Sequence, residues 1–214
     1  MKSKKSIKNH QDIFLTVGAL IFGLILLVIV VNKSVFSGVD LTIRRAVQSI
    51  HSPLFSTTMN VVSQIGDDFN LEIIIVLAMA LLYLAGLKME AIKTALLTAS
   101  AATIGSLAKT IVNRPRPGNG EVMIQEILSD KSFPSLHVLI FTVFFGYMLY
   151  LSVYKVKTRW LRTLIALPST FLILTIGLSR IYLGAHWASD TVGGYLMGAL
   201  FLIFAVKISG KSSN

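Results

Sequence analysis

Long runs of apolar residues constrain this chain more than any other feature of its sequence. Six runs are each about as long as the roughly 20 residues that a helix needs to cross the hydrocarbon core of a bilayer. They cover residues 13–31, 71–87, 91–112, 135–154, 163–183 and 187–206. Because a backbone in lipid must satisfy its own hydrogen bonds, we expect each run to be a helix. The sequence therefore predicts an all-α integral membrane protein with six transmembrane helices.

The composition favours a membrane protein over a soluble one. Hydrophobic residues make up 54% of the 214 residues and charged residues only 14%, which is little charge for the surface of a soluble domain. The net charge is +10, but the basic residues lie mainly at the ends of the apolar runs. That placement is typical of contact with anionic headgroups rather than with nucleic acid. We expect a single membrane-embedded domain over residues 1–214, with the bilayer as its partner and no nucleic acid.

The distribution of lysine and arginine predicts how the chain crosses the membrane. If the N-terminus is cytoplasmic, twelve of the 20 basic residues lie on the cytoplasmic side. These are Lys2, Lys4, Lys5, Lys8, Lys88, Lys93, Lys155, Lys157, Arg159, Arg162, Lys207 and Lys211. The positive-inside rule then favours a multi-pass protein with both termini in the cytoplasm.

The segment between the first two runs is expected to form short interfacial helices. Residues 39–50 place Arg44 and Arg45 among apolar residues, a pattern typical of a helix that lies in the membrane interface. Pro53 ends this pattern. Residues 55–65 are apolar enough for a second short helix or for an extension of the next span.

Three polar segments lie at the ends of the predicted spans and include residues that membrane proteins rarely keep without a reason. They are residues 109–117 after the third run, 134–137 at the start of the fourth, and 179–190 between the last two. The predicted threading brings all three to the outer face. Such convergence predicts one site on the extracytoplasmic side.

The residue types in these segments indicate a site for a phosphate group. Lys109, Arg116 and Arg180 supply three cations, and arginine can donate two parallel hydrogen bonds to phosphate oxygens. Ser135 adds a hydroxyl donor. Pro134 suits the first turn of a helix, so the amides that begin the fourth span can point at an anion.

The same segments hold the groups for nucleophilic catalysis. His186 and Asp190 are four residues apart, which places them on one face of a helix. A carboxylate there can hold one imidazole nitrogen and leave the other free to attack. His137 is the candidate proton donor to the leaving oxygen. These groups need no metal and no cofactor, and the absence of cysteine excludes thiolate metal sites.

Each of these residues also has a purely structural interpretation. Lys109 can be a snorkelling lysine at a helix end, and Arg114 and Arg116 can be interface anchors. His137 can lie at the level of the headgroups, and a histidine–aspartate pair can be structural. The catalytic interpretation is favoured because the structural one requires all these residues to lie on the same face by chance.

The three segments resemble the signature of the type-2 phosphatidic acid phosphatase superfamily, the lipid phosphate phosphatases. The first has lysine, six residues, then Arg116-Pro117. The third has Ser179-Arg180, five residues, His186, three residues and Asp190. The likeness is greatest to small bacterial members of the phosphatidylglycerophosphatase B group, which implies a bacterial plasma-membrane protein.

The resemblance also implies roles for individual residues. His186 becomes transiently phosphorylated, Asp190 orients it, and His137 protonates the leaving alkoxide. The phosphate is held by the side chains of Lys109, Arg116, Ser135 and Arg180 and by neighbouring backbone amides, including that of Leu136. The family usually has glycine where this chain has Leu136, and leucine adds bulk and excludes dihedral angles that only glycine adopts. This difference bears on the shape of the pocket and on the choice of substrate.

The expected function is hydrolysis of a lipid phosphate monoester, with phosphatidylglycerol phosphate as the best candidate substrate. An undecaprenyl diphosphate phosphatase, which recycles a cell-wall carrier lipid, is the nearest alternative, because an outward-facing site suits its substrate. Vanadium haloperoxidases share the signature, but a chain with six membrane spans argues against this function. A membrane transporter is disfavoured, because transporters bind substrate near the bilayer midplane.

Overall fold

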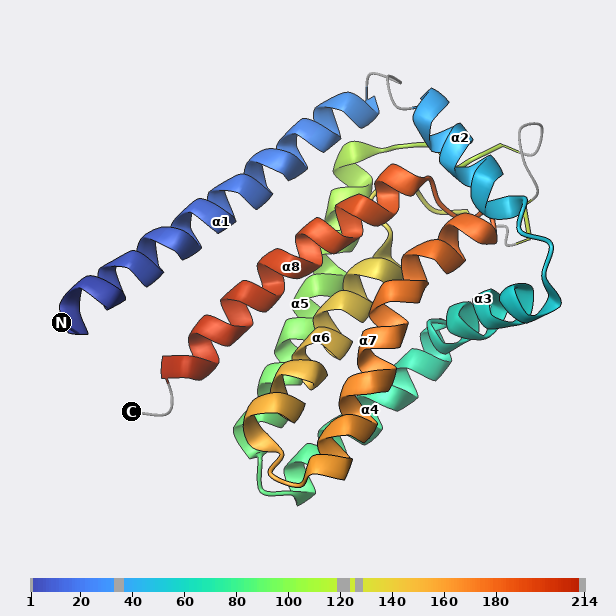
Figure 1. Cartoon of the computed structure of the whole chain (residues 1–214). Helices are drawn as coiled ribbons and strands as arrows, with labels where there is room; N and C mark the ends of the chain where they lie inside the picture. Colours follow the sequence, from blue (N-terminus) through green and yellow to red (C-terminus); the bar gives the residue numbers. More distant parts are fainter. Residues whose placement is uncertain (1, 33–36, 119–123, 126–128, 212–214) are drawn as a thin grey trace.

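A computed structural model describes residues 2–32, 37–118, 124–125 and 129–211 of the chain, and these residues form eight α-helices (Figure 1). The helices are α1 (Lys2–Asn32), α2 (Ser37–Gln48), α3 (Pro53–Ile65), α4 (Asp68–Leu84), α5 (Lys88–Val112), α6 (Leu136–Lys155), α7 (Arg159–Tyr182) and α8 (Ala188–Lys211). Within these ranges there is no β-strand. The prediction of an all-α fold is confirmed.

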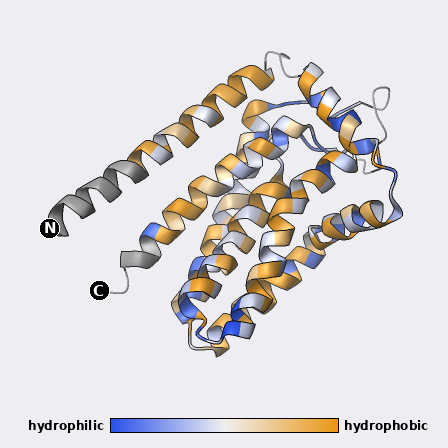
Figure 2. Cartoon of the chain, viewed as in Figure 1, coloured by the Kyte–Doolittle hydropathy of each residue, from blue (hydrophilic) through white to orange (hydrophobic). Residues whose placement is uncertain are grey.

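Five of the helices are long and apolar enough to cross a membrane. They cover Phe14–Val31, Lys88–Val112, Leu136–Lys155, Arg159–Tyr182 and Ala188–Lys207, and α4 holds a shorter apolar stretch, Phe69–Leu84. Large hydrophobic side chains on these helices point outward, including Phe22, Leu84 and Leu167. Figure 2 shows hydrophobic residues along the helices and hydrophilic residues mostly near the two ends of the bundle. An apolar surface of this extent requires lipid around it, and the chain is a multi-pass membrane protein.

Helix α6 is the centre of the bundle. It packs against α5, α7 and α8 (Figure 1), and its side chains Val138, Phe141 and Phe144 are almost completely buried. Aromatic rings of α6 also pack edge to face, with the centroids of Phe144 and Phe145 4.9 Å apart. Because α6 is held on three sides, the residues at its N-terminal end have a well-defined position relative to α5, α7 and α8.

Several helix ends differ from the ends of the apolar runs for local reasons. α4 ends at Leu84, three residues before the predicted end, because Gly86 adopts a left-handed φ of 80°. The amides of Gly86 and Leu87 then donate to the carbonyls of Tyr83 and Leu82, the Schellman pattern that closes a helix. α7 begins at Arg159, four residues before its predicted start, because the extended Thr158 is its N-cap residue and the Thr158 carbonyl accepts the first helical hydrogen bond, from the amide of Arg162 at 3.0 Å.

The start of α6 corrects a second expectation. Pro134 does not occupy the first turn of the helix, because α6 begins at Leu136. The Phe133–Pro134 peptide bond is cis, and Ser135 is the N-cap residue with extended dihedral angles. The first-turn amides that have no intrahelical acceptor therefore start at Leu136.

Helices α2 and α3 occupy the segment where two short helices were predicted. Ser52 caps α3 by accepting a hydrogen bond from the amide of Phe55 at 3.4 Å. Within α2, the side chain of Arg44 is fully buried while the neighbouring Arg45 is exposed. Asp40, one turn earlier, is also fully buried. α2 thus turns a charged face toward the protein.

Candidate active site

The three polar segments meet at one end of the bundle. The end of α5, the start of α6 and the junction of α7 and α8 lie together, beneath α2 (Figure 1). A cavity of about 320 Å³ opens there. It is lined by Gly66, Leu71, Lys109, Arg116, Ser129, Asp130, Leu136, His137, Ile140 and His186. Five of the eight predicted site residues therefore line one cavity.

A carboxylate lies between two of the predicted phosphate-binding cations. Asp130 forms ion pairs with both Lys109 and Arg116, and the Nε of Arg116 donates to the Asp130 carbonyl at 2.9 Å. Partial burial would raise the pKa of the Asp130 carboxyl, but the hydrogen bonds from Lys109 and Arg116 outweigh it and lower the pKa to about 2. Asp130 is thus ionised at neutral pH and occupies anion-binding groups that a phosphate would need.

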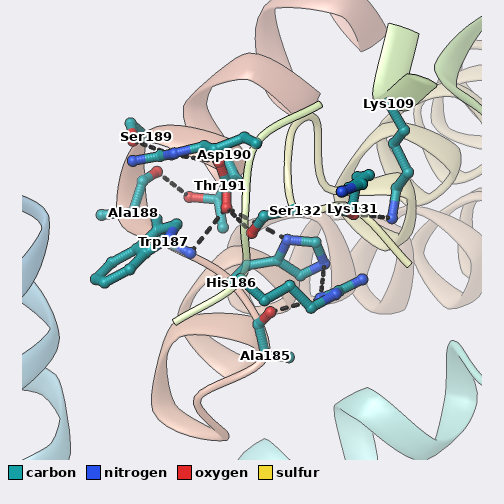
Figure 3. A network of polar contacts seen from close by, with 12 residues as sticks. Lys109, Lys131, Ser132, Ala185, His186, Trp187, Ala188, Ser189, Asp190 and Thr191 are labelled. Atoms are coloured by element: carbon teal, nitrogen blue, oxygen red, sulfur yellow. Dashed lines mark hydrogen bonds and ion pairs between the residues drawn. The ribbon is translucent and has the colours of Figure 1, made fainter. Parts of the chain in front are cut away.

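The imidazole of His186 lies between these cations and a second carboxylate. Its Nε2 is 3.2 Å from a terminal nitrogen of Arg116, and its Nδ1 is 3.5 Å from an oxygen of Asp190. Figure 3 shows the ring with Asp190 and Ser132 on one side and Lys109 beyond the other. Burial lowers the pKa of His186 to about 4; Asp190 opposes this, and the charges of Arg116 and Arg180 add to it. His186 is therefore a neutral imidazole at neutral pH.

The prediction that His186 and Asp190 share a helix face is wrong. α8 begins at Ala188, so His186 lies in the turn before the helix and Asp190 in its first turn. Asp190 accepts a hydrogen bond from the amide of Trp187 at 2.9 Å, which satisfies one of the free amides at the helix start. The pair is brought together by this capped turn rather than by helical periodicity.

The remaining contacts of Asp190 come from two other segments. Its oxygens accept hydrogen bonds from the hydroxyl of Ser132 and from Arg114. Arg114 also pairs with Asp40 of α2, where a guanidinium nitrogen is 2.7 Å from a carboxylate oxygen. Arg114 is therefore not a membrane anchor but a buried bridge between two carboxylates.

The other three predicted residues, Asp190, Ser135 and Arg180, are not among the described residues that line the cavity. Ser135 and Arg180 are fully buried. Arg180 donates a hydrogen bond to the hydroxyl of Ser63 on α3. The hydroxyl of Ser135 and the Nε2 of His137 are buried and have no hydrogen-bond partner among the described residues. Gly66 allows His137 to pack closely, since a Cβ there would lie 2.5 Å from its ring.

Leu136 stands where the family usually has glycine, and its side chain fits because Gly105 of α5 has no Cβ. A Cβ at Gly105 of α5 would lie 2.5 Å from a methyl group of Leu136 and 2.6 Å from one of Leu139. Leu136 packs against the buried cluster of Ala101, Leu139, Val143 and Met197 and also lines the cavity. Its side chain therefore belongs both to the helix packing and to the wall of the site.

Sequence reasoning missed Asp40, Asp130, Ser132 and Ser189. None belongs to the three patterns of cations and histidines. The position of Asp130 and Ser132 just before the second segment, and that of Ser189 within the third, suggested proximity. No feature of the sequence pairs Asp40 with Arg114, 74 positions away. Among the residues that the structure describes, no group of three or more His, Cys, Asp or Glu side chains is arranged to hold a metal ion.

The arrangement has the chemistry of a phosphoryl-transfer centre. A neutral, oriented imidazole presents Nε2 to a cavity that contains two cations, which favours attack on an anionic phosphate rather than on a neutral carbonyl. His137 faces the same cavity and has room to exchange a proton with a bound group.

Comparison with known proteins points to one family. The profile of the PAP2 superfamily matches residues 90–213, more than half of the chain. The chain is 24% identical to phosphatidylglycerophosphatase B of Bacillus subtilis strain 168 over 184 residues, which cover 86% of this chain and 89% of that protein. A crystal structure of a transmembrane PAP2-type phosphatidylglycerolphosphate phosphatase from Bacillus subtilis has the same fold. Its TM-score is 0.79 at 21% identity, over 92% of this chain and 97% of that one.

Two other relatives match over shorter stretches. An undecaprenyl-diphosphatase of Sulfolobus acidocaldarius is 27% identical over 111 residues, half of each chain. The bacitracin transport permease protein BcrC of Bacillus licheniformis is 33% identical over 84 residues, which cover 39% of this chain and 36% of that protein. The chain thus spans half or less of the length of these two relatives.

Proposed function

This chain belongs to the PAP2 superfamily, and from that premise we propose that it hydrolyses the phosphate monoester of a membrane lipid, with phosphatidylglycerol phosphate as the preferred substrate. The observation that carries the proposal is the position of the His186 ring. Its Nε2 meets Arg116 at the cavity while Nδ1 faces Asp190. That geometry suits a nucleophile beside an anion-binding site.

In the first step, the substrate phosphate replaces the Asp130 carboxylate between Lys109 and Arg116. The Nε2 of His186 forms a bond to phosphorus as the bond from phosphorus to the lipid oxygen breaks. His137 transfers a proton to that oxygen, so the lipid leaves as an alcohol. Asp190 stabilises the positive charge that develops on the His186 ring.

In the second step, water releases the phosphate. His137, now neutral, accepts a proton from water as the oxygen bonds to phosphorus and the bond to His186 breaks. Inorganic phosphate leaves and both histidines return to their starting states. Lys109 and Arg116 hold the phosphoryl oxygens throughout and stabilise the negative charge of the transition state.

The choice of phosphatidylglycerol phosphate rests on the extent of similarity. The relative that matches over most of both chains is phosphatidylglycerophosphatase B, whereas the undecaprenyl-diphosphatase matches over half. Undecaprenyl diphosphate remains the second candidate, since a diphosphate has the same terminal group for Lys109 and Arg116 to bind. Transport is disfavoured, because the buried charges of the site lie at one end of the helices rather than halfway along them (Figure 1).

The test is phosphate release by the purified protein in detergent, with phosphatidylglycerol phosphate, phosphatidic acid and undecaprenyl diphosphate compared at equal surface concentration. We expect the highest kcat/KM for phosphatidylglycerol phosphate and no loss of turnover in EDTA, because the cations of the site are side chains. A higher kcat/KM for undecaprenyl diphosphate would transfer the proposal to the second candidate. Turnover that depends on added Mg²⁺ would contradict the histidine mechanism.

The threading of the chain is part of the proposal. The five long helices and α4 make six spans. With 17 residues, α4 is roughly 26 Å long, slightly shorter than the bilayer core of about 30 Å. Both termini lie in the cytoplasm of a bacterial cell, and α2 and α3 lie at the outer interface beside the site. The lysine and arginine asymmetry supports this orientation.

A further inference from the structure

A fully buried carboxylate outside the segment that matches the family profile is connected to the proposed catalytic pair. Asp40 of α2 has no exposed surface. It accepts hydrogen bonds from the amide of Ser189 at 2.8 Å, from the Ser189 hydroxyl at 2.6 Å and from Arg114 at 2.7 Å. An ionised carboxylate in such a place requires partners of this number and geometry.

Arg114 is shared between Asp40 and Asp190. One terminal nitrogen donates to Asp40, and the other donates to Asp190 and, at 2.8 Å, to the hydroxyl of Ser189. The other oxygen of Asp190 faces the Nδ1 of His186 at 3.5 Å. A continuous line of contacts therefore runs from α2 to the imidazole: Asp40, Arg114, Asp190, His186.

The charge on Asp40 affects how much of the negative charge of Asp190 is available to the His186 ring. With both carboxylates present, the guanidinium of Arg114 is divided between them, and Asp190 keeps negative charge for the imidazole. Without Asp40, Arg114 neutralises Asp190 alone. Arg44, whose guanidinium lies 5.7 Å from the centre of the Trp187 ring, adds positive charge on the same side. In a buried site such charges interact strongly, because water does not screen them.

We propose that Asp40 is a positioning residue that balances the charge of Arg114 and so keeps Asp190 available to stabilise the His186 ring during phosphoryl transfer. This inference rests on the proposed role of His186 as nucleophile. Asp40 does not touch the cavity or the phosphate-binding pair Lys109 and Arg116. Its removal therefore affects the chemical step and leaves substrate binding almost unchanged.

The first test is the Asp40→Asn variant, which keeps the size of the side chain and removes its charge. We expect kcat to fall roughly 10–100-fold, the loss seen when a residue that orients a metal-binding histidine is removed, with KM almost unchanged. An unaltered kcat, or a loss confined to KM, would overturn the inference. If Asp40→Asn does not fold, Asp40→Ser serves instead, because it also removes the charge while keeping a hydroxyl oxygen that can accept a hydrogen bond, and a wild-type kcat there has the same meaning.

A double variant separates charge balance from simple anchoring of α2. Asp40→Asn combined with Arg114→Gln removes one negative and one positive charge, so Asp190 again keeps its charge for His186. We expect this double variant to turn over faster than Asp40→Asn alone. If Asp40 only anchored α2, the second substitution would remove further contacts, and the double variant would be no faster.

Gln48→Leu is the matched control for anchoring. Gln48 also ties α2 to the bundle, through a 2.9 Å hydrogen bond to the Tyr182 carbonyl, but lies outside the line of charges. We expect a lower melting temperature and a wild-type kcat, whereas a fall in kcat equal to that of Asp40→Asn would reject the inference. His186→Ala is assayed beside these variants. Activity of His186→Ala would reject the proposed function itself, while an inactive His186→Ala with a fully active Asp40→Asn rejects only the role of Asp40.

Discussion

At the scale of single residues, Asp130 is the side chain that most directly competes with a substrate. Its carboxylate pairs with both Lys109 and Arg116, the two cations at the cavity assigned to the phosphate. About half of its side chain is exposed, so it can move aside when a phosphate enters. A substrate that carries two negative charges replaces a ligand that carries one.

Removal of this competitor should tighten the binding of anions. We predict that Asp130→Asn lowers the inhibition constant for inorganic phosphate roughly five-fold, which corresponds to about 1 kcal/mol for a partly exposed ion pair. Phosphate inhibition of lipid hydrolysis measures this constant. Ser129→Ala, at the adjacent position of the cavity wall, is the control and should keep the wild-type value. An unchanged or weaker inhibition in Asp130→Asn would show that Asp130 does not occupy the phosphate site.

The low pKa of His186 predicts a pH dependence of stability. The unfolded chain takes up a proton on this imidazole near pH 6.5, whereas the folded protein resists protonation down to a pKa of about 4. Between these values the unfolded state binds more protons, so the free energy of unfolding falls as the pH drops from 6.5 to 4. The full effect is on the order of 3 kcal/mol.

Melting temperatures of the wild type and of His186→Asn between pH 7 and pH 4 provide the measurement. We expect the wild type to lose stability more steeply across this range, because the variant lacks the titrating group. Titrating residues that do not interact with His186 contribute equally to both curves and cancel in the difference. Parallel curves would mean that His186 is protonated as easily in the folded protein as in the unfolded chain.

At the scale of elements, the contact of α5 with α6 depends on Leu136 and Gly105. The side chain of Leu136 fills the space left by the missing Cβ of Gly105. Leu136→Gly should lower the free energy of unfolding by about 2 kcal/mol or more, through lost burial and added backbone freedom. Gly105→Ala should also destabilise the wild type, because its new Cβ meets Leu136 and Leu139.

A double-mutant cycle tests whether these two positions act together. In the Leu136→Gly background, Gly105→Ala should cost less stability than in the wild type, since one of the two methyl groups in its way is gone. The melting temperatures of the four proteins give the coupling. Additive losses would show that Leu136 and Gly105 contribute to stability independently of each other.

Helix existence could be predicted from the sequence, while several helix ends and contacts could not. Apolar runs of sufficient length identify helices in lipid, because the backbone has no other way to satisfy its hydrogen bonds. The end of α4 depends on the dihedral angles of Gly86, and the start of α6 on the geometry around Pro134. Such local conformations follow from tertiary packing as much as from residue type.

The same limit applies to the site. Lys109, Arg116, His137 and His186 were found because cations and imidazoles near membrane spans are costly and stand out. Asp40 was missed, because an acidic residue in a short amphipathic helix is ordinary until its partner is known. Only the packing of α2 across the start of α8 brings it to Arg114 and Ser189.

At the scale of the whole molecule, the site and the loop between α6 and α7 lie at opposite ends of the bundle (Figure 1). The proposed orientation predicts that Gly118→Cys is labelled by a membrane-impermeant thiol reagent in intact cells, whereas Lys157→Cys is labelled only after lysis. Both residues are exposed, and the chain has no cysteine of its own, so each label reports one position. The reverse pattern would place the active site in the cytoplasm.

In the proposed mechanism, His186 carries the phosphoryl group during turnover. The most direct test is to stop the reaction in its steady state with alkali, which preserves phosphohistidine, and to locate the phosphate by peptide mass spectrometry. We predict phosphate on the peptide that contains His186, its loss on acid treatment, and its absence from the His186→Ala variant. Full turnover by His186→Ala, or phosphate on another residue of the wild type, would contradict the account.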